Sequence, residues 1–233
     1  MRQRGFVSVV RTEEGKMKRE VDLAEISDGR LYGLNDMVRA DCGDCEGCSA
    51  CCHDMGVSIV LTPLDCHRLS KFTGVSVDGL LQDKLELHVV DGMILPNLCM
   101  AGADQACGFL DGEGRCSVHP ARPDICRMFP LGRIYEEDGF RYFLQVHECR
   151  KENRAKVKVK KWLDEPETAK NQAFIQKWHD LLGRIRGELD ESGDEEARKS
   201  WNMYILQTFY LTPYRKDFYE EFETRYREAL CRL

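Results

Sequence analysis

A ladder of closely spaced cysteines limits the folds open to this chain more than any other feature. Four cysteines recur at every third position and the last is doubled, giving Cys42, Cys45, Cys48, Cys51 and Cys52. CxxC spacing lets two thiolates of one tight turn reach the same metal, and its repetition can bring a third to the same ion or iron–sulfur cluster. The ladder therefore predicts a metal-binding loop, around which a fold must close.

Cysteine usage in the whole chain separates two chemistries. Of twelve cysteines, all but Cys231 fall between Cys42 and Cys149. Such density is typical either of disulfides in a secreted protein or of metal ligands in a reducing compartment. The short apolar run at 6–10 is too short for a signal-peptide core, and adjacent cysteines rarely bond each other. We therefore expect metal ligands and a cytoplasmic protein.

Composition narrows the class of protein. The 233 residues are 42% hydrophobic and 32% charged, which predicts a globular chain rather than a disordered one. A formal net charge of -6 argues against a general nucleic-acid binder. No stretch approaches the roughly 20 apolar residues of a membrane span. We expect no membrane contact and no nucleic acid, and leave open a protein partner.

The sequence pattern predicts an α+β fold in three regions: a lead-in at 1–41, a cysteine-cluster domain at 42–150 and a helical region at 151–233. Asp-Gly turns predict hairpins around 91–92 and 138–139, and a third hairpin is expected to pair the segments of Cys107 and Cys116. Expected helices lie at about 31–39, 62–72, 77–84, 124–128, 168–189, 195–210 and 212–230. The run at 6–10 is expected to form a strand.

Four later cysteines offer partners for the ladder: Cys107, Cys116, Cys126 and Cys149. Thiolate-rich sites suit zinc or iron–sulfur clusters, because both favour soft sulfur ligands. A centre with four thiolates carries net negative charge. Arg122 and Arg127 flank Cys126, and we expect them to offset that charge or to donate hydrogen bonds to sulfur.

These elements together resemble the YkgJ-type cysteine-cluster proteins, whose CxxCxxCC domain is described as chelating zinc or iron. The matching motifs are C-E-G-C-S-A-C-C at 45–52, C-G-F-L at 107–110, C-S-V-H-P-A-R-P-D-I-C-R-M-F-P at 116–130 and the late Cys149. The resemblance spans about 42–150. It implies the ligand set Cys45, Cys48, Cys51, Cys52, Cys107, Cys116, Cys126 and Cys149.

The resemblance leaves the centre itself open. Eight cysteines suffice for one four-ligand site with spares, for two sites, or for one site beside a redox-active thiol pair. The clustered ladder favours an iron–sulfur cluster, 4Fe–4S in type, over zinc, which usually takes two separated CxxC pairs. Three functions follow as alternatives: an iron–sulfur redox component, a structural zinc module for interactions, or a protein-modifying enzyme, since flagellin lysine N-methylases carry a similar motif.

Several residues outside the pattern remain candidates. Cys42 shares the ladder spacing, Cys99 lies near the second motif, and His53 and His119 each stand close to a pattern cysteine. Cys66 is expected to be a buried free thiol. The basic run at 150–161 is expected to be a solvated linker or helix face, with contact to nucleic acid or an acidic partner as the alternative.

Overall fold

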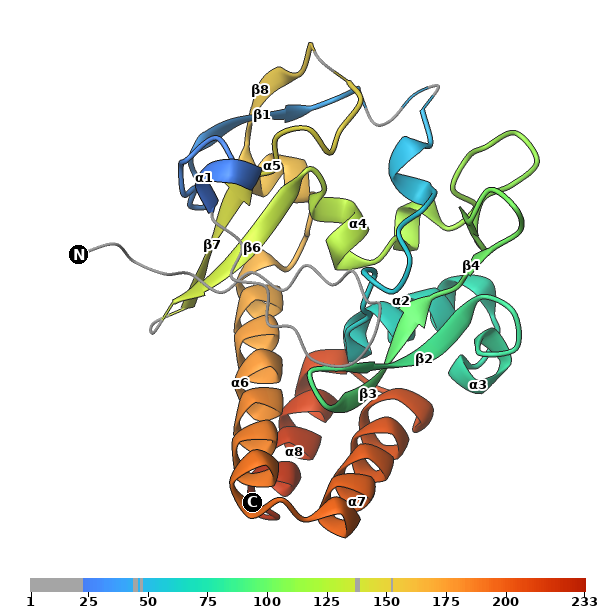
Figure 1. Cartoon of the computed structure of the whole chain (residues 1–233), viewed down its shortest axis with the longest axis vertical. Helices are drawn as coiled ribbons and strands as arrows, with labels where there is room; N and C mark the ends of the chain where they lie inside the picture. Colours follow the sequence, from blue (N-terminus) through green and yellow to red (C-terminus); the bar gives the residue numbers. More distant parts are fainter. Residues whose placement is uncertain (1–22, 44–45, 47, 137–138, 152) are drawn as a thin grey trace. The chain divides into compact units, whose positions relative to one another are not determined.

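The computed structural model describes residues 23–43, 46, 48–136, 139–151 and 153–233, and confirms the α+β class (Figure 1). The chain folds into two compact units. The first, here the cysteine unit, comprises the described residues up to Ile59 together with Met100–Ser117 and Asp124–Pro166. The second, the aromatic unit, comprises Val60–Cys99, Val118–Pro123 and Glu167–Leu233. The division expected from sequence stays a prediction, and the expected strand at 6–10 lies outside the described residues.

Short antiparallel strand pairs build the cysteine unit. The pairs are β1 (Met37–Asp41) with β8 (Ala155–Lys158), β4 (Met100–Ala101) with β5 (Ala106–Cys107), and β6 (Leu131–Glu136) with β7 (Gly139–Leu144). The helical elements are short, namely α1 (Leu23–Ile26), η1 (Ala50–Cys52), α4 (Asp124–Met128) and α5 (Val159–Leu163). The β6–β7 hairpin and α4 confirm the sequence predictions for these segments.

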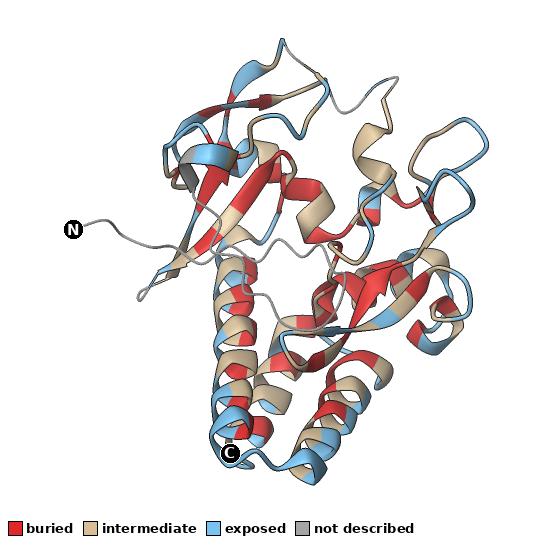
Figure 2. Ribbon diagram, viewed as in Figure 1, coloured by how far each residue is buried: buried red, intermediate tan, exposed pale blue. Residues whose placement is uncertain are grey.

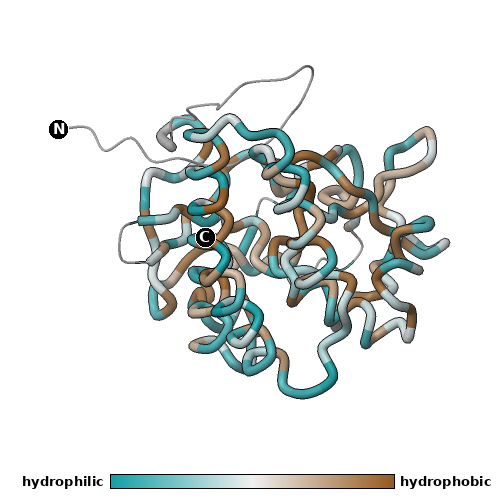
Figure 3. Tube along the Cα trace, turned by 90° about the horizontal axis from the view of Figure 1, so that it is seen from below, coloured by the Kyte–Doolittle hydropathy of each residue, from teal (hydrophilic) through white to brown (hydrophobic). Residues whose placement is uncertain are grey.

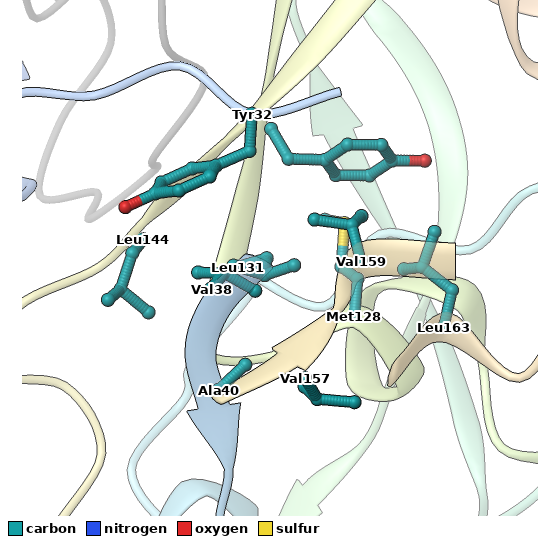
Figure 4. Close-up of a cluster of buried hydrophobic side chains, with 10 residues drawn as sticks. Tyr32, Val38, Ala40, Met128, Leu131, Leu144, Val157, Val159 and Leu163 are labelled. Atoms are coloured by element: carbon teal, nitrogen blue, oxygen red, sulfur yellow. The ribbon is translucent and has the colours of Figure 1, made fainter. Parts of the chain in front are cut away.

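An aliphatic core holds these strands together. Val38 and Ala40 alternate along β1 toward the interior, and Val157 of β8 lies opposite Val38. They pack with residues of α4, β6, β7 and α5, among them Met128, Leu131, Leu144, Val159 and Leu163 (Figure 4). Alternation with a period of two is how a strand presents one face to a core, so this packing requires extended backbone in β1.

The expected helix at 31–39 is wrong. Tyr32 instead forms a β-bridge with Tyr142, and its backbone N–H donates to the Tyr142 carbonyl at 2.7 Å. Asp36 accepts a hydrogen bond from the Gly33 N–H at 2.7 Å, which closes a turn before β1 begins. Pairing with β7 and β8 thus outweighs the local helical pattern, as tertiary context commonly does for short segments.

A buried ion pair joins α4 to the β6–β7 hairpin. Arg133 of β6 donates to the carboxylate of Asp124, and both side chains are about nine-tenths buried. The guanidinium also lies over the Phe140 ring, 4.7 Å from its centroid. One position away, the Phe143 ring packs directly over Gly132, where a Cβ would clash with it. Figure 2 shows the buried residues of these strands in red.

The aromatic unit contains a hairpin and longer helices. The hairpin joins β2 (Leu85–Val90) to β3 (Met93–Leu98), as the Asp91-Gly92 turn predicts. Its helices are α2 (Pro63–Thr73), α3 (Val77–Leu80), η2 (His119–Ala121), α6 (Thr168–Ser192), α7 (Glu195–Ile205), the π-helical η3 (Leu206–Leu211) and α8 (Phe218–Leu230). Thr62 and Asp65 form a full capping box at α2, and Gly74 ends that helix in the left-handed conformation.

Packed rings fill the interior of this unit. The Phe222 ring of α8 meets Phe174 edge-on at 4.7 Å between centroids, and Trp178 of α6 lies 5.1 Å from Phe209 of η3. The last helix begins at Phe218 rather than at the expected Thr212. Arg225 explains the delay, because its guanidinium donates to the carbonyls of Thr208, Thr212 and Pro213 and holds this connection outside the helix.

Apolar and polar residues are interspersed along the helices rather than gathered in one long stretch (Figure 3). Within the described part of the chain, no helix combines the length and the apolar character needed to cross a bilayer.

Candidate metal centre

All the ladder and pattern cysteines belong to the segments of the cysteine unit, whereas Cys66, Cys99 and Cys231 belong to the aromatic unit. Cys66 is 1% exposed and free, which confirms the prediction of a buried thiol. Metal-ligand candidates are therefore concentrated in one of the two units.

One pocket of the cysteine unit gathers four of these thiols. The residues that line it are Cys42, Cys48, Ala50, Cys51, Phe129, Glu148, Cys149, Arg150 and Lys151. The ladder contributes three cysteines and the segment after β7 contributes the fourth. Cys48, Cys51 and Cys149 are half-buried free thiols, so they are accessible to an ion or cluster from the pocket.

Local backbone geometry turns the ladder toward the pocket. Asp41, the last residue of β1, accepts a hydrogen bond from the Gly43 N–H at 3.0 Å, and Gly43 adopts a positive φ of 69°. Beyond it, the short helix η1 contains Cys51 and Cys52, and the Cys52 N–H donates to the Ser49 carbonyl at 2.8 Å. A strand end followed by tight turns thus places Cys42, Cys48 and Cys51 along one wall.

The doubled cysteine separates into two environments. Cys51 lines the pocket, whereas Cys52 is not among the lining residues. The pKa of the Cys51 thiol lies far above its ordinary value, because a hydrogen bond with Cys52 and, next, burial both disfavour the thiolate. A metal that binds Cys51 must therefore displace its proton and compete with the contact to Cys52.

Two cations stand at the pocket beside Cys149. Arg150 is exposed and Lys151 half-buried, and Glu148 is the one carboxylate among the lining residues. The Lys151 ammonium donates to the Glu46 carbonyl at 3.0 Å, which ties the segment after β7 to the ladder. This contact holds Cys149 near the ladder, and the positive charges favour thiolates and the anionic centre they form.

The remaining pattern cysteines lie elsewhere in the same unit. Cys107 is buried at the end of β5, opposite Met100, and Cys116 forms an isolated bridge with Leu110. The expected pairing of Cys107 with Cys116 across one hairpin is therefore wrong, because β5 pairs with β4 and the turn at Asp111 closes on Leu110 instead. Cys126 is half-buried in α4. Their metal ligation stays a prediction.

Cys45, which the family pattern names, lies outside the described residues. Within the described ranges, no three His, Cys, Asp or Glu side chains are arranged as ligands of a single ion. The donor set itself suits a metal: four thiols, two neighbouring cations and the apolar Phe129 and Ala50 line one pocket. Thiolates in a partly water-excluded, electropositive site are the ligands that zinc and iron–sulfur clusters take.

The arginines and histidines singled out from sequence have other contacts. The Arg122 guanidinium lies against the His119 ring, and both belong to the aromatic unit. Arg127 is buried and donates to the Asp164 carbonyl at 3.3 Å. His53 contacts the Asp104 carbonyl at 3.2 Å through its Nδ1. A role for Arg122 or Arg127 beside a bound centre stays a prediction.

Sequence reasoning gave Cys42 and the cations at 150–151 too little weight. The family pattern begins at Cys45 and drew attention away from Cys42, although the spacing of Cys42 to Cys45 is the same as that of the next pair. Direct adjacency to Cys149 was the signal for Arg150 and Lys151. Phe129, next to the R-M-F-P motif, carried no signal of its own.

Comparisons with known proteins agree with this concentration of thiols. No curated protein and no solved structure matches the chain. A family model does match, that of the CxxCxxCC family, described as a "putative zinc- or iron-chelating domain", over residues 44–165. This match covers more than half of the chain and includes every cysteine of the expected ligand set. The protein thus belongs to the CxxCxxCC family, whose metal-chelating cysteines lie in its cysteine unit.

Proposed function

We propose that the pocket of the cysteine unit binds an iron–sulfur cluster and that the protein is a redox component. Cys48, Cys51 and Cys149 are the proposed ligands from the described pocket, and Cys42 or Cys45 supplies the fourth thiolate. The observation that carries the proposal is the convergence of four cysteines from distant segments on one pocket. Each cysteine of a 4Fe–4S site binds a different iron, so its ligands stand around a pocket.

Charge and polarity at the pocket support a redox role. A 4Fe–4S cluster with four thiolates carries a net negative charge, and it supplies one-electron transfer when bound. Arg150 and Lys151 stabilise the more negative, reduced state. Phe129 and Ala50 limit access of water from their side of the pocket. Net charge, hydrogen bonds and solvent exposure are the properties by which a protein sets the potential of such a cluster.

The decisive measurement is the composition of anaerobically purified protein. Iron, zinc and acid-labile sulfide are determined together, for the natural chain and for Cys149→Ser. We expect iron and sulfide in equal amounts with visible absorption in the natural chain, and their loss in the variant. Cys231→Ser is the matched control, because Cys231 is exposed in the aromatic unit and its replacement leaves the metal content unchanged.

Stoichiometric zinc without iron or sulfide would contradict the iron–sulfur proposal and identify a structural zinc module instead. A second pair of variants assigns the fourth ligand. Cys42→Ser and Cys45→Ser are compared for iron content, and the ligand is the residue whose replacement lowers it. Should both variants keep full iron content, the proposed ligand set is wrong.

A further inference from the structure

The pocket lies at the end of a two-stranded sheet with an exposed basic face. Cys42 directly follows β1, and β8 begins four residues after Lys151, another pocket residue. Asp41 and Ala155 are paired at this end of the sheet. Both strands of the β1–β8 pair therefore start or finish beside the pocket.

The two faces of this sheet differ in character. Val38, Ala40 and Val157 point into the core. The opposite face presents Met37, Arg39, Lys156 and Lys158, all exposed, and Met37 stands directly across from Lys158. We call these four residues the basic face. Lys160 and Lys161 of α5 follow it along the chain and are also exposed.

The charge of the basic face is not neutralised internally. Within the described residues, no ion pair holds Arg39, Lys156 or Lys158. Asp41 is the one carboxylate of the two strands, and its side chain accepts from the Gly43 N–H at 3.0 Å. A cluster of like charges repels itself and is costly to keep together, although each side chain is solvated. In a chain with a net charge of -6, this local excess of cations stands out.

We propose that the basic face docks an acidic electron-transfer protein, which exchanges one electron with the centre in the pocket. The inference rests on the proposed redox function. In the exchange the carrier is oxidised by one electron and the bound centre is reduced by one. Charge complementarity supports such a partner, because weak electron-transfer complexes have small interfaces and depend on electrostatic steering. Met37, 48% exposed among the cations, offers an apolar contact at their centre.

The same face fits a polyanion less well. Proteins that bind single strands combine cations with aromatic side chains on which bases stack, and the basic face has no aromatic residue. A nucleic acid or an anionic bilayer also extends beyond the Debye length of about 8 Å and meets the acidic remainder of the molecule. A compact protein with an acidic patch avoids that repulsion.

The test uses a plant-type 2Fe–2S ferredoxin as the acidic carrier and the full-length holoprotein. Binding is measured by calorimetry at low and at high salt, and reduction of the holoprotein by the reduced carrier is measured by stopped flow. The test variant is Lys156→Glu with Lys158→Glu. Its matched control, Lys199→Glu with Lys216→Glu, makes the same charge change at exposed positions of the aromatic unit.

We expect the basic-face variant to lose about 10-fold or more in association rate at low salt, and high salt to remove the advantage of the natural chain. The control variant and the natural chain should agree within about 2-fold. Reduction by methyl viologen, a small reductant that needs no docking surface, should be equal in all three. Circular dichroism checks that both variants are folded.

Equal ferredoxin binding by the test and control variants would overturn the proposal. So would tighter binding of a DNA duplex or of phosphatidylserine vesicles than of ferredoxin at the same salt. Failure of the proposed function has a different signature: protein without iron that still binds ferredoxin through Lys156 and Lys158 has the docking surface but no iron–sulfur centre.

Discussion

The cysteine unit and the aromatic unit fill their interiors with different material. The aromatic unit packs rings from α6, η3 and α8 against one another, with Phe222 only 2% exposed among them. The cysteine unit has an aliphatic core between strands of four to six residues, and beside it a pocket lined by thiols and charges. Two-stranded sheets of this length are marginal in water without further support.

This difference indicates how each unit is stabilised. A ring cluster buries much apolar area per residue and needs no ligand. Thiols brought together from distant segments contribute little until a metal joins them, and metal binding then contributes directly to folding. We infer that the cysteine unit depends on its metal and the aromatic unit does not.

Removing the metal should have the largest effect on this comparison. Thiolate metal sites contribute on the order of 10 kcal/mol of folding free energy. After chelation, we expect amides of β6 and β7 to exchange much faster, while those of α6 and α8 stay protected. Hydrogen exchange followed by mass spectrometry of the intact holo and apo chains measures both. Equal deprotection of the two units, or none in either, would contradict the inferred difference.

The converse change acts on the ring cluster. Phe222→Ala removes a ring in contact with Phe174, Phe209 and Phe218, and should cost about 3–5 kcal/mol through the cavity it leaves. We expect earlier urea unfolding of α6 and α8 with unchanged metal content. Phe72→Ala is the control in the same unit, because Phe72 is 49% exposed and its truncation should change little. Loss of metal in Phe222→Ala would show that the units are not independent.

Sequence periodicity predicted the aromatic unit well, since its helices are long enough to show a pattern. The stripe of Phe174, Trp178 and Ile185 lies buried on α6, and the capping box at Thr62 forms as expected. The pause before α8 escaped prediction, because it depends on Arg225 reaching carbonyls 12 to 17 residues earlier.

The cysteine unit was harder to predict. Its strands are short, and their pairing joins residues as distant as Met37 and Lys158, which no local pattern reveals. Motif spacing nevertheless located the thiols that matter, because CxxC geometry is local. The part that spacing could not provide was the choice between Cys42 and Cys45 and the arrival of Lys151 at the ladder, since both depend on how distant segments meet.

A third change tests whether the cysteine unit also relies on polar contacts in its interior. Arg133→Met leaves the buried Asp124 carboxylate without its cation, which typically costs about 3–5 kcal/mol. We expect lower urea stability and faster exchange in β6 and α4. Arg141→Met, at the exposed pair with Glu136 on the same hairpin, is the control and should have little effect. If the two variants behave alike, the buried pair has no special weight in this unit.

The smallest effect concerns the pH dependence of the aromatic unit. His67 stacks on Phe218 at 5.5 Å, and burial, followed by the charges of Lys71 and Arg68, lowers its pKa below the ordinary 6.5. Above pH 6.5 the ring is neutral in the folded and unfolded chain alike. Below it, the unfolded chain takes up a proton that the folded chain resists, so stability falls as the pH drops. Urea titrations of α6 and α8 at several pH values should show this decrease in the natural chain and a weaker one in His67→Gln. An identical decrease in both would assign the pH dependence to other groups, and only the ring cluster would then remain to distinguish this unit from its neighbour.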